Sequence, residues 1–459
     1  MKIRNPATLS VLEEVATDDA ASVAKKYARA WAAQPAWAAT ALSRRLACLR
    51  EFRDAVARER DGLALILTRE MGKPVTQARN ELNALAGRID FFLEHTEKVL
   101  TPEVVLEERD GGALKLEESI VFEPLGVIAN VSAWNYPWFV GSNVFVPALL
   151  TGNSVLYKPS EHATLTGLAI ERLLHASGVP KDAFIAVIGP GDVGQALLSQ
   201  PINGVFFTGS YRTGKKIAEH VAARFVRLGL ELGGKDPTYV CEDVDVRKAA
   251  ESLADGAMYN TGQSCCSVER IYVHRAIADD FLREFVDVVK SFTIGDPEDD
   301  KTYIGPLARE EQLAELELQV QDALSKGARL LIGGKRIDRT GYYFEPTVLT
   351  DVSDDMRIMR EESFGPIIGI GRVNDDAEAI RRMNDTEYGL TAGVYTRDQN
   401  RANAILSQLD AGSVYWNCCD RVSPRLPWTG RKHSGLGSTL STHGIRSFLQ
   451  PKAWHRRAP

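Results

Sequence analysis

Two adjacent cysteines lie in a segment of small and polar residues, NTGQSCC, at positions 260–266. A cysteine thiolate attacks carbonyl carbon when its surroundings favour the charged form. Most buried cysteines are inert core residues, but glycine and small polar neighbours favour a reactive thiol here. Cys418 and Cys419 have a similar setting, and the spacing of the two pairs disfavours a shared zinc ion.

Three polar residues follow apolar, strand-like runs. They are Asn135 in SAWNYPW, Lys158 in LYKPSE and Glu231 in LGLELGG. In a parallel sheet the carboxyl ends of the strands form one edge, and ligands bind there. A carboxylate at the end of an apolar strand is costly unless it is paired or takes part in a reaction. Glu231 could be a structural residue that forms a salt bridge at the end of its strand, or it could be an acid–base group of a reaction, and both interpretations stay open.

Two glycine-rich turns follow predicted strands and open predicted helices, as nucleotide-binding turns do. GPGDVG at 189–194 matches the pattern G-x-G-x-x-G, but its proline lacks an amide. No acidic strand end follows about 20 residues later, as that pattern requires. FTGSYRTG at 207–214 is the second turn. A plain strand-to-helix turn remains an alternative for the first, and spacing alone does not choose between the two.

Apolar runs alternate with helical patterns through most of the chain, which predicts parallel sheets with helices on both faces. The first series of predicted strands is 127–132, 153–157, 184–188, 204–207 and 226–232. The second series is 237–241, 270–274, 328–332, 367–371, 390–395 and 412–416. The predicted helices are 20–33, 42–67, 75–100, 165–177, 193–200, 213–224, 278–292, 309–326, 375–383 and 399–409.

Residues 105–123 differ from the rest, because polar and apolar residues alternate around Asp110-Gly111. That dipeptide is a strong hairpin signal, so an exposed β-ribbon is predicted. Two strands bury little apolar surface alone, which favours contact with another subunit. The C-terminal tail, 438–459, is basic and is expected to dock elsewhere.

The composition is that of an ordinary globular protein. The chain has 459 residues, 44% hydrophobic and 25% charged, with a formal net charge of −6, which excludes disorder, collagen and coiled coil for the whole chain. No Lys/Arg-rich run stands out, so no nucleic acid partner is expected. Six cysteines without a C-x-x-C motif fit a reducing, cytoplasmic location.

The segment 124–157 carries no charge, but asparagines and prolines interrupt it. A membrane-spanning helix needs about 20 mostly apolar residues without such breaks. Strand, polar loop, helix and strand are therefore predicted, with no membrane span. The N-terminal residues lack the apolar core of a secretion signal, so none is expected.

Seven motifs, in their order and spacing, resemble the NAD(P)-dependent aldehyde dehydrogenase superfamily over nearly the whole chain. They are WNYPW (134–138), KPSE (158–161), FTGS (207–210), LELGGKDP (230–237), GQSCC (262–266), EESFGP (361–366) and PWTGRKHSGLG (427–437). The resemblance implies an α/β fold with two doubly wound parallel-sheet domains plus a small β oligomerisation arm. The implied parts are an NAD-binding, Rossmann-like domain (1–104 and 124–230), a catalytic domain (231–432) and an oligomerisation arm and tail (105–123 and 433–459).

The resemblance also implies roles for the residues that end the strands. Cys265 is the implied nucleophile, which forms a thiohemiacetal with an aldehyde and then a thioester. Asn135 is implied to stabilise the oxyanion, and Glu231 to act as general base in thioester hydrolysis. The implied reaction is NAD-dependent oxidation of an aldehyde to its carboxylic acid, with no metal.

The family's cofactor motifs fall on ten residues. They are Ser132, Trp134, Lys158, Glu161, Gly191, Gly209, Ser210, Gly214, Glu362 and Phe364. The resemblance thus favours the second glycine turn for the pyrophosphate and puts the first beside the adenine. Lys158 and Glu161 are implied to hold the adenosine ribose, where a carboxylate repels the additional phosphate of NADP. NAD is the expected cofactor, with NADP second.

Four aromatic residues are expected to line the substrate pocket: Tyr136, Trp138, Tyr259 and Trp428. Aromatic rings would favour apolar or aromatic aldehydes, or would enclose a quaternary ammonium group. Arg421 and Arg425 would suit the carboxylate of a semialdehyde, but we expect them to face solvent or another subunit. The protein is expected to be a homodimer or homotetramer.

Three other functions remain open. A CoA-acylating dehydrogenase would pass the thioester to coenzyme A, but retention of Glu231 favours hydrolysis. A cofactor-free cysteine hydrolase would use Cys265 with His433 or His443 and would leave the nucleotide motifs unexplained. A scaffold with a dehydrogenase fold would bind the dinucleotide without oxidising an aldehyde.

Overall fold

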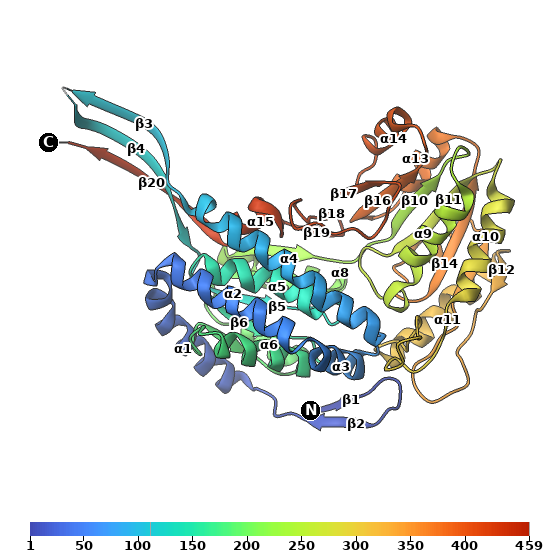
Figure 1. Ribbon diagram of the computed structural model, residues 1–459, viewed down its shortest axis with the longest axis horizontal. Coiled ribbons are helices and arrows are strands. Elements are labelled where there is room, and N and C mark those ends of the chain that lie inside the picture. Colours follow the sequence, from blue (N-terminus) through green and yellow to red (C-terminus); the bar gives the residue numbers. More distant parts are fainter. Residues whose placement is uncertain (111, 459) are drawn as a thin grey trace.

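The computed structural model describes residues 1–110 and 112–458. Figure 1 shows a helix-rich α/β unit, a second α/β unit beside it and a ribbon that projects from the first unit. Gly111 of the predicted turn and Pro459 of the predicted tail lie outside the described residues. The two sheets and the ribbon confirm the predicted fold class, whereas the residue ranges of the domains stay a prediction.

The first unit is built on a sheet of order β19-β9-β8-β5-β6-β7. Strands β5 to β9 pair in parallel, and β19 is antiparallel to β9. From β5 the chain moves outward to β6 and β7 and then returns to β8 on the other side of β5, so a ligand crevice is expected at this reversal. The strands are β5 (Val127–Val131), β6 (Ser154–Lys158), β7 (Phe184–Ala186), β8 (Gly204–Thr208), β9 (Arg227–Glu231) and β19 (Gly435–Leu436).

Helices cover this sheet, and nearly all of α5 is buried. The uncharged segment 124–157 thus forms the predicted strand, loop, helix and strand, and no described helix is long and apolar enough to cross a membrane. The single helix predicted at 42–67 is wrong, because the chain bends at Glu59 (φ −98°, ψ 7°) and forms two helices. The helices are α1 (Ala20–Ala39), α2 (Leu42–Arg58), α3 (Arg60–Met71), α4 (Val75–Leu100), α5 (Pro137–Leu150), α6 (Thr164–Ala176), α7 (Gly191–Leu198) and α8 (Tyr211–Val221).

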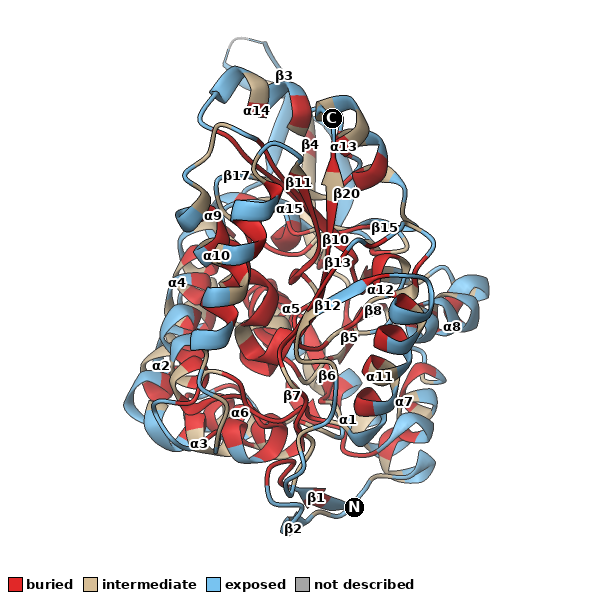
Figure 2. Ribbon diagram, turned by 90° about the vertical axis from the view of Figure 1, so that its right-hand side faces the viewer, coloured by how far each residue is buried: buried red, intermediate tan, exposed pale blue. Residues whose placement is uncertain are grey.

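The second unit has a sheet of order β12-β13-β14-β11-β10-β16-β17, in which β12 is the antiparallel edge. Figure 2 shows that the strands of the sheets are mostly buried while the outer helix faces are exposed. The strands are β10 (Asp236–Val240), β11 (Val268–His274), β12 (Arg329–Ile332), β13 (Thr347–Thr350), β14 (Ile367–Val373), β16 (Thr391–Tyr395) and β17 (Ser413–Trp416). The helices are α9 (Val246–Met258), η2 (Tyr259–Gly262), α10 (Ala278–Ser291), α11 (Glu310–Ser325), α12 (Arg357–Arg360), α13 (Asp376–Asn384) and α14 (Gln399–Leu406).

Strand β13 and helix α9 were not among the predicted elements. β13 has four residues, a length at which periodicity carries little information. Small residues weaken the helical pattern of α9, yet they are needed, because a Cβ at Gly256 would lie 2.4 Å from Cys419 Sγ. Close packing of α9 therefore accounts for its weak signal.

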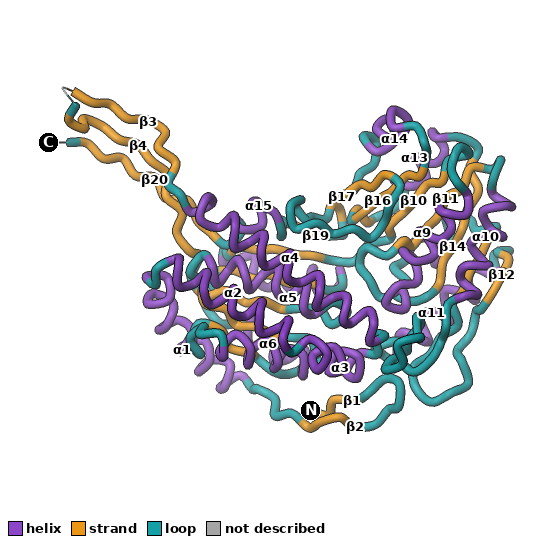
Figure 3. The backbone as a smooth tube through the Cα atoms, in the orientation of Figure 1, coloured by secondary structure: helices purple, strands orange, loops and turns teal. Residues whose placement is uncertain are grey.

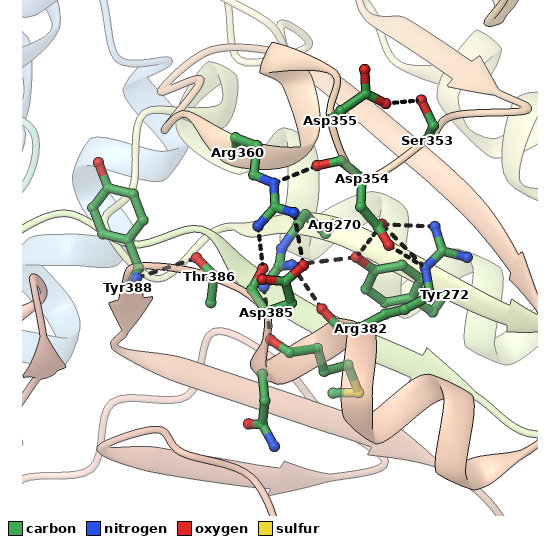
Figure 4. A network of polar contacts seen from close by, with 12 residues as sticks. Arg270, Tyr272, Ser353, Asp354, Asp355, Arg360, Arg382, Asp385, Thr386 and Tyr388 are labelled. Carbon is green, nitrogen blue, oxygen red and sulfur yellow. Dashed lines mark hydrogen bonds and ion pairs between the residues drawn. The ribbon is translucent and has the colours of Figure 1, made fainter.

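A buried arginine on the second sheet connects β11 to neighbouring segments through hydrogen bonds. Arg270 on β11 is 1% exposed and donates to the carbonyls of Lys235 (2.9 Å), Arg382 (3.2 Å) and Met383 (3.0 Å). The last two lie in the final turn of α13, where backbone carbonyls lack helical partners. Figure 4 shows this arginine beside the ion pair of Arg382 with Asp354, so the loop after α13 is fixed against β11.

The projecting ribbon has the order β20-β4-β3 and extends away from both sheets, with its base beside the first unit (Figure 3). It confirms the antiparallel pairing predicted within 105–123. Of the predicted tail segment 433–459, only β20 joins the ribbon, since β19 pairs with β9 and α15 packs on α4. The elements are β3 (Glu103–Asp110), β4 (Ala113–Pro124), α15 (Ser441–Arg446) and β20 (Leu449–Arg457), with minor strands β1 (Lys2–Arg4), β2 (Val11–Glu14), β15 (Tyr388–Gly389) and β18 (Arg431–Lys432).

Candidate active site

Two cavities meet at three of the candidate residues. The sheet cavity, about 840 Å³, lies at the carboxyl ends of β5, β6, β8 and β9. The α4 cavity, about 760 Å³, opens between α4, the start of α5 and the segments 259–266 and 420–428. Asn135, Glu231 and Cys265 line both cavities. A ligand in one cavity and a ligand in the other would therefore meet at these side chains.

The loop that carries Cys265 has a strained backbone. Asn260 (φ 54°), Thr261 (φ 57°) and Gly262 (φ 71°) are left-handed, which costs a non-glycine residue about 1–3 kcal/mol. A Cβ at Gly262 would lie 2.2 Å from the carbonyl oxygen of Gly365. Only glycine fits there, and the strain persists because surrounding hydrogen bonds hold the loop.

These hydrogen bonds connect the cysteine loop to α4 and to the end of β5. The backbone N–H of Asn260 donates to Gln77 Oε1 (2.8 Å), and Asn260 Nδ2 donates to the carbonyls of Asn135 (3.2 Å) and Gln263 (3.0 Å). Asn135 Nδ2 in turn donates to the Gln263 carbonyl (3.2 Å). An amide donor is thus held directly against the loop of Cys265.

Glu231 is the last residue of β9, and Thr439 donates a hydrogen bond to its Oε1. Burial raises the pKa of Glu231 to about 7, while the Thr439 hydroxyl and the charge of Arg88 act in the opposite direction. A carboxyl group with such a pKa exchanges protons at neutral pH. The salt-bridged strand end that the sequence left open is not found, because Glu231 makes no ion pair with any described residue.

Nine of the ten predicted cofactor residues line the sheet cavity, and Gly214 does not. A Cβ at Gly214 would lie 2.5 Å from Leu232 Cδ2, so this glycine lets α8 pack closely on the chain after β9. Both glycine turns contribute, the first through Gly191 and the second through Gly209 and Ser210. The nine residues are Ser132, Trp134, Lys158, Glu161, Gly191, Gly209, Ser210, Glu362 and Phe364.

Lys158 and Glu161 are two of the charged residues that line this cavity. Burial lowers the pKa of Lys158. Burial raises the pKa of Glu161, but its own backbone amide and the charge of Lys158 outweigh that effect and bring the pKa below its usual value. Glu161 is therefore a carboxylate at neutral pH.

A buried ion pair positions the segment that carries Glu362 and Phe364. Lys235 Nζ donates to Glu269 Oε2 (2.5 Å), and Glu269 accepts from the backbone N–H of Ser363 (2.8 Å) and Phe364 (3.0 Å). The Phe364 ring lies edge-on to Trp134, with centroids 5.5 Å apart. Both rings are thereby fixed at the wall of the sheet cavity.

Glu362 itself is held close to the glycine pair after β9. It accepts from the Gly234 N–H (3.1 Å), and a Cβ at Gly233 would lie 2.4 Å from its carboxylate. Burial, together with the charge of Glu269, raises the pKa of Glu362 to about 8.

The α4 cavity contains three of the four predicted aromatic residues: Tyr136, Tyr259 and Trp428. Trp138 is wrong, because α5 turns its side chain into the core, where it is 1% exposed. Arg421 and Arg425 are exposed, as expected, and they also line the α4 cavity. His433 and His443, the partners that a cysteine hydrolase would need, line neither cavity, and His433 stacks on Tyr211 instead.

The sequence analysis missed lining residues that distant elements supply. Arg309 and Gln312 line the sheet cavity, and Glu81, Arg88, Asn143 and Asp420 line the α4 cavity. One signal was available, since Gln77, Glu81 and Arg88 recur at helical spacing among apolar residues of α4. Polar side chains on the inward face of a helix point to a cavity or a network.

Comparison with known proteins identifies the class. Residues 1–454 match the model of the aldehyde dehydrogenase family. The chain is 37% identical to 3,6-anhydro-alpha-L-galactose dehydrogenase of Streptomyces coelicolor (100% of this chain, 93% of that protein). It is 34% identical to succinate-semialdehyde dehydrogenase (NADP(+)) of Deinococcus radiodurans (98% and 93%). A solved structure of indole-3-acetaldehyde dehydrogenase complexed with NAD+ is 32% identical, with a TM-score of 0.96 (100% and 93%).

The protein therefore belongs to the aldehyde dehydrogenase family, which confirms the resemblance read from the seven motifs. It is an oxidoreductase of a family that uses NAD or NADP. The names of these three relatives give three different aldehydes, and the two that include a dinucleotide give NADP(+) in one and NAD+ in the other.

The raised pKa of Glu231 predicts a pH-dependent stability. Its folded pKa, about 7, exceeds the ordinary value of 4.5, so the folded protein binds the proton more tightly and loses stability as pH rises from about 4.5 to 7. The complete shift corresponds to about 3 kcal/mol, and access of water through the cavities reduces it to roughly 1–2 kcal/mol. Glu231→Gln should therefore stabilise the protein at pH 8 and have little effect at pH 4.5.

Thermal unfolding at both pH values measures this difference. Glu94→Gln, an exposed change on α4, is the control and should give the same small difference at both pH values. A stability change for Glu231→Gln that does not vary with pH would contradict the prediction.

Proposed function

We propose that the protein oxidises an aldehyde to its carboxylic acid with NAD. The observation that carries the proposal is the meeting of two cavities at Asn135, Glu231 and Cys265. Both cavities fall in the size range of ligand and cofactor pockets. A thiol, an amide donor and a carboxyl group with a pKa near 7 are the groups that this reaction uses.

In the proposed reaction Cys265 attacks the aldehyde carbon as a thiolate, which leaves an oxyanion on the former carbonyl. Asn135 Nδ2 and the Cys265 backbone N–H stabilise that charge, and one such donor typically contributes about 3–4 kcal/mol. When bound, the nicotinamide supplies the hydride acceptor, and an acyl thioester remains on Cys265. Glu231 then takes a proton from water, which hydrolyses the thioester and releases the acid.

The residues of the sheet cavity fit a dinucleotide. Two helices, α7 and α8, begin at its glycine turns, and helix N-termini favour phosphate. Arg309 supports this fit, since its guanidinium lies 5.6 Å from the Trp134 ring centroid and its buried Nε has no partner among the described residues. Lys158, 4% exposed, supplies a second cation.

Cys265 should be essential for oxidation while its neighbour is not. Cys265→Ala removes the nucleophile, so NADH formation should fall by at least about a thousandfold, with NAD binding unchanged by titration calorimetry. Cys266→Ala is the matched control, because Cys266 donates its hydrogen bond to Asp420 (2.9 Å) and should retain activity within about threefold. Normal turnover by Cys265→Ala, with an aldehyde that the native enzyme oxidises, would refute the proposal.

The preference for NAD follows from the carboxylate of Glu161. Like charges at close range repel, so we expect the native enzyme to have a higher kcat/KM for NAD than for NADP. Glu161→Gln should lower the NAD-to-NADP ratio by about tenfold, which equals about 1.4 kcal/mol. Glu59→Gln, which removes an exposed charge paired with Arg172, serves as control. A native preference for NADP would contradict this expectation.

We also propose that the ribbon joins subunits into a homodimer or homotetramer. Its outer strand β3 exposes Val104 (56%), Val105 (60%) and Leu106 (39%), and an exposed apolar edge strand favours pairing. The full chain should sediment as a dimer or tetramer at micromolar concentration, and a chain that ends at Phe448 should form a smaller species. A monomeric full chain would contradict this proposal.

We propose a cytoplasmic location because the cysteines, all of which the structure describes, form no disulfide bonds. All six are free, and four of them are buried. Free thiols persist in reducing compartments.

A further inference from the structure

The α4 cavity contains a buried guanidinium that forms no direct ion pair within the described residues. Arg88 on α4 is 7% exposed, and its Nη1 donates to Asn143 Oδ1 (3.1 Å). Asn143 is the one hydrogen-bond acceptor of its side chain among the described residues, and Arg88 lines the cavity. Unpaired charges are rarely buried in proteins unless a ligand or a reaction uses them.

The guanidinium is held in a fixed plane. Its central carbon lies 3.9 Å from the ring centroid of Phe139, a geometry in which the cation stacks on an aromatic face. Burial lowers the pKa of Arg88 to about 10, so it remains a cation at neutral pH. A fixed planar guanidinium with free donors is suited to bind a carboxylate through two hydrogen bonds.

The acidic residues of the same cavity already have protein partners. Glu81 forms a buried ion pair with Lys73. Asp420 accepts from Cys266 (2.9 Å) and Asp255 from Tyr303 (2.5 Å). Glu231 accepts from Thr439, as described above.

A hydrogen bond from a thiol or a hydroxyl does not cancel the charge of a carboxylate, so the cavity holds groups of both signs, and Arg88 supplies its buried positive charge. Arg421 and Arg425, exposed at the edge of the cavity and without an ion pair within the described chain, add to it. Arg421 and Arg425 belong to the segment 420–428, which is far from α4 in the sequence. Two separate parts of the chain therefore contribute positively charged side chains to the cavity.

We propose that the aldehyde substrate carries a carboxylate at its other end and that Arg88 binds this group. The inference rests on the proposed function, since Cys265 and Arg88 line one cavity and a short chain would place its aldehyde at the thiol and its carboxylate at the guanidinium. Asn143 is a positioning residue, which fixes the guanidinium through its Oδ1. The aromatic walls, Tyr136 and Tyr259, contact the chain between the two ends.

Three aldehydes of equal chain length test this charge requirement. Succinic semialdehyde is the anionic probe, butanal the neutral probe and 4-(trimethylammonio)butanal the cationic probe. We expect kcat/KM for the anionic probe to exceed both others by at least about tenfold, because a neutral chain leaves Arg88 without a partner. A kcat/KM for the neutral or the cationic probe that equals or exceeds the value for the anionic probe overturns the proposal.

Variants assign that preference to Arg88. Arg88→Met should reduce the ratio of kcat/KM for the anionic over the neutral probe by at least about tenfold, mainly through KM. Arg88→Lys, which keeps the charge without the planar fork, should give an intermediate ratio. Arg79→Met removes a partly exposed charge, paired with Asp300, from the same helix and should leave the ratio unchanged. A ratio that is the same in Arg88→Met and the native enzyme overturns the proposal.

Binding of a non-reactive dicarboxylate separates this inference from the reaction itself. Succinate should bind to Cys265→Ala in titration calorimetry, and adding Arg88→Met should weaken that binding by at least about tenfold. Such binding with no oxidation of any probe would leave the Arg88 site standing and refute the proposed function. Oxidation of butanal with no succinate binding would refute the Arg88 site and leave the proposed function standing.

Discussion

The buried ion pair between Lys235 and Glu269 holds the two halves of the candidate site in one arrangement. Lys235 lies four residues after Glu231, and Glu269 lies four residues after Cys265, so the pair joins the two segments on which these groups are carried. Glu269 also accepts from the backbone of Ser363 and Phe364. A charge pair in the interior is costly to desolvate, and its additional hydrogen bonds offset that cost. The acid, the thiol and the wall of the sheet cavity consequently share one rigid support.

The sheet topology adds a second constraint, which brings separate parts of the chain to one junction. Asn135 follows β5 and Glu231 ends β9 in the first sheet, whereas Cys265 precedes β11 of the second. The three groups thus come from the ends of three different strands, and no single strand carries the site. The two cavities exist because the second unit packs across the carboxyl edge of the first, so the thiol faces the strand ends.

The sequence predicted what depends on local pattern and missed what depends on tertiary packing. Strand ends and glycine turns are local, so Asn135, Lys158 and Ser210 were placed at the correct edge of the sheet. Trp138 was misplaced because it was assigned to the pocket from its position in the WNYPW motif, whereas Pro137 begins α5 and the helix turns Trp138 into the core. Arg88 and Asp420 were missed because they are 332 positions apart in sequence and meet the thiol only in the folded chain. The two-helix form of 42–71 was missed because both helices continue one apolar pattern across Glu59.

Helix α4 connects the chemistry of the thiol to the charge of its cavity. Gln77 holds the strained loop at Asn260, Glu81 accepts from the backbone N–H of Trp138 at the start of α5 (3.0 Å), and Arg88 faces the α4 cavity. These contacts lie along one face of one helix, so a shift of α4 would disturb the cysteine loop, the start of α5 and the guanidinium together. Left-handed residues in the loop store free energy that such contacts must offset. In the proposed complex, a substrate bound to Cys265 at one end and to Arg88 at the other would join α4 to the same loop that Gln77 already holds.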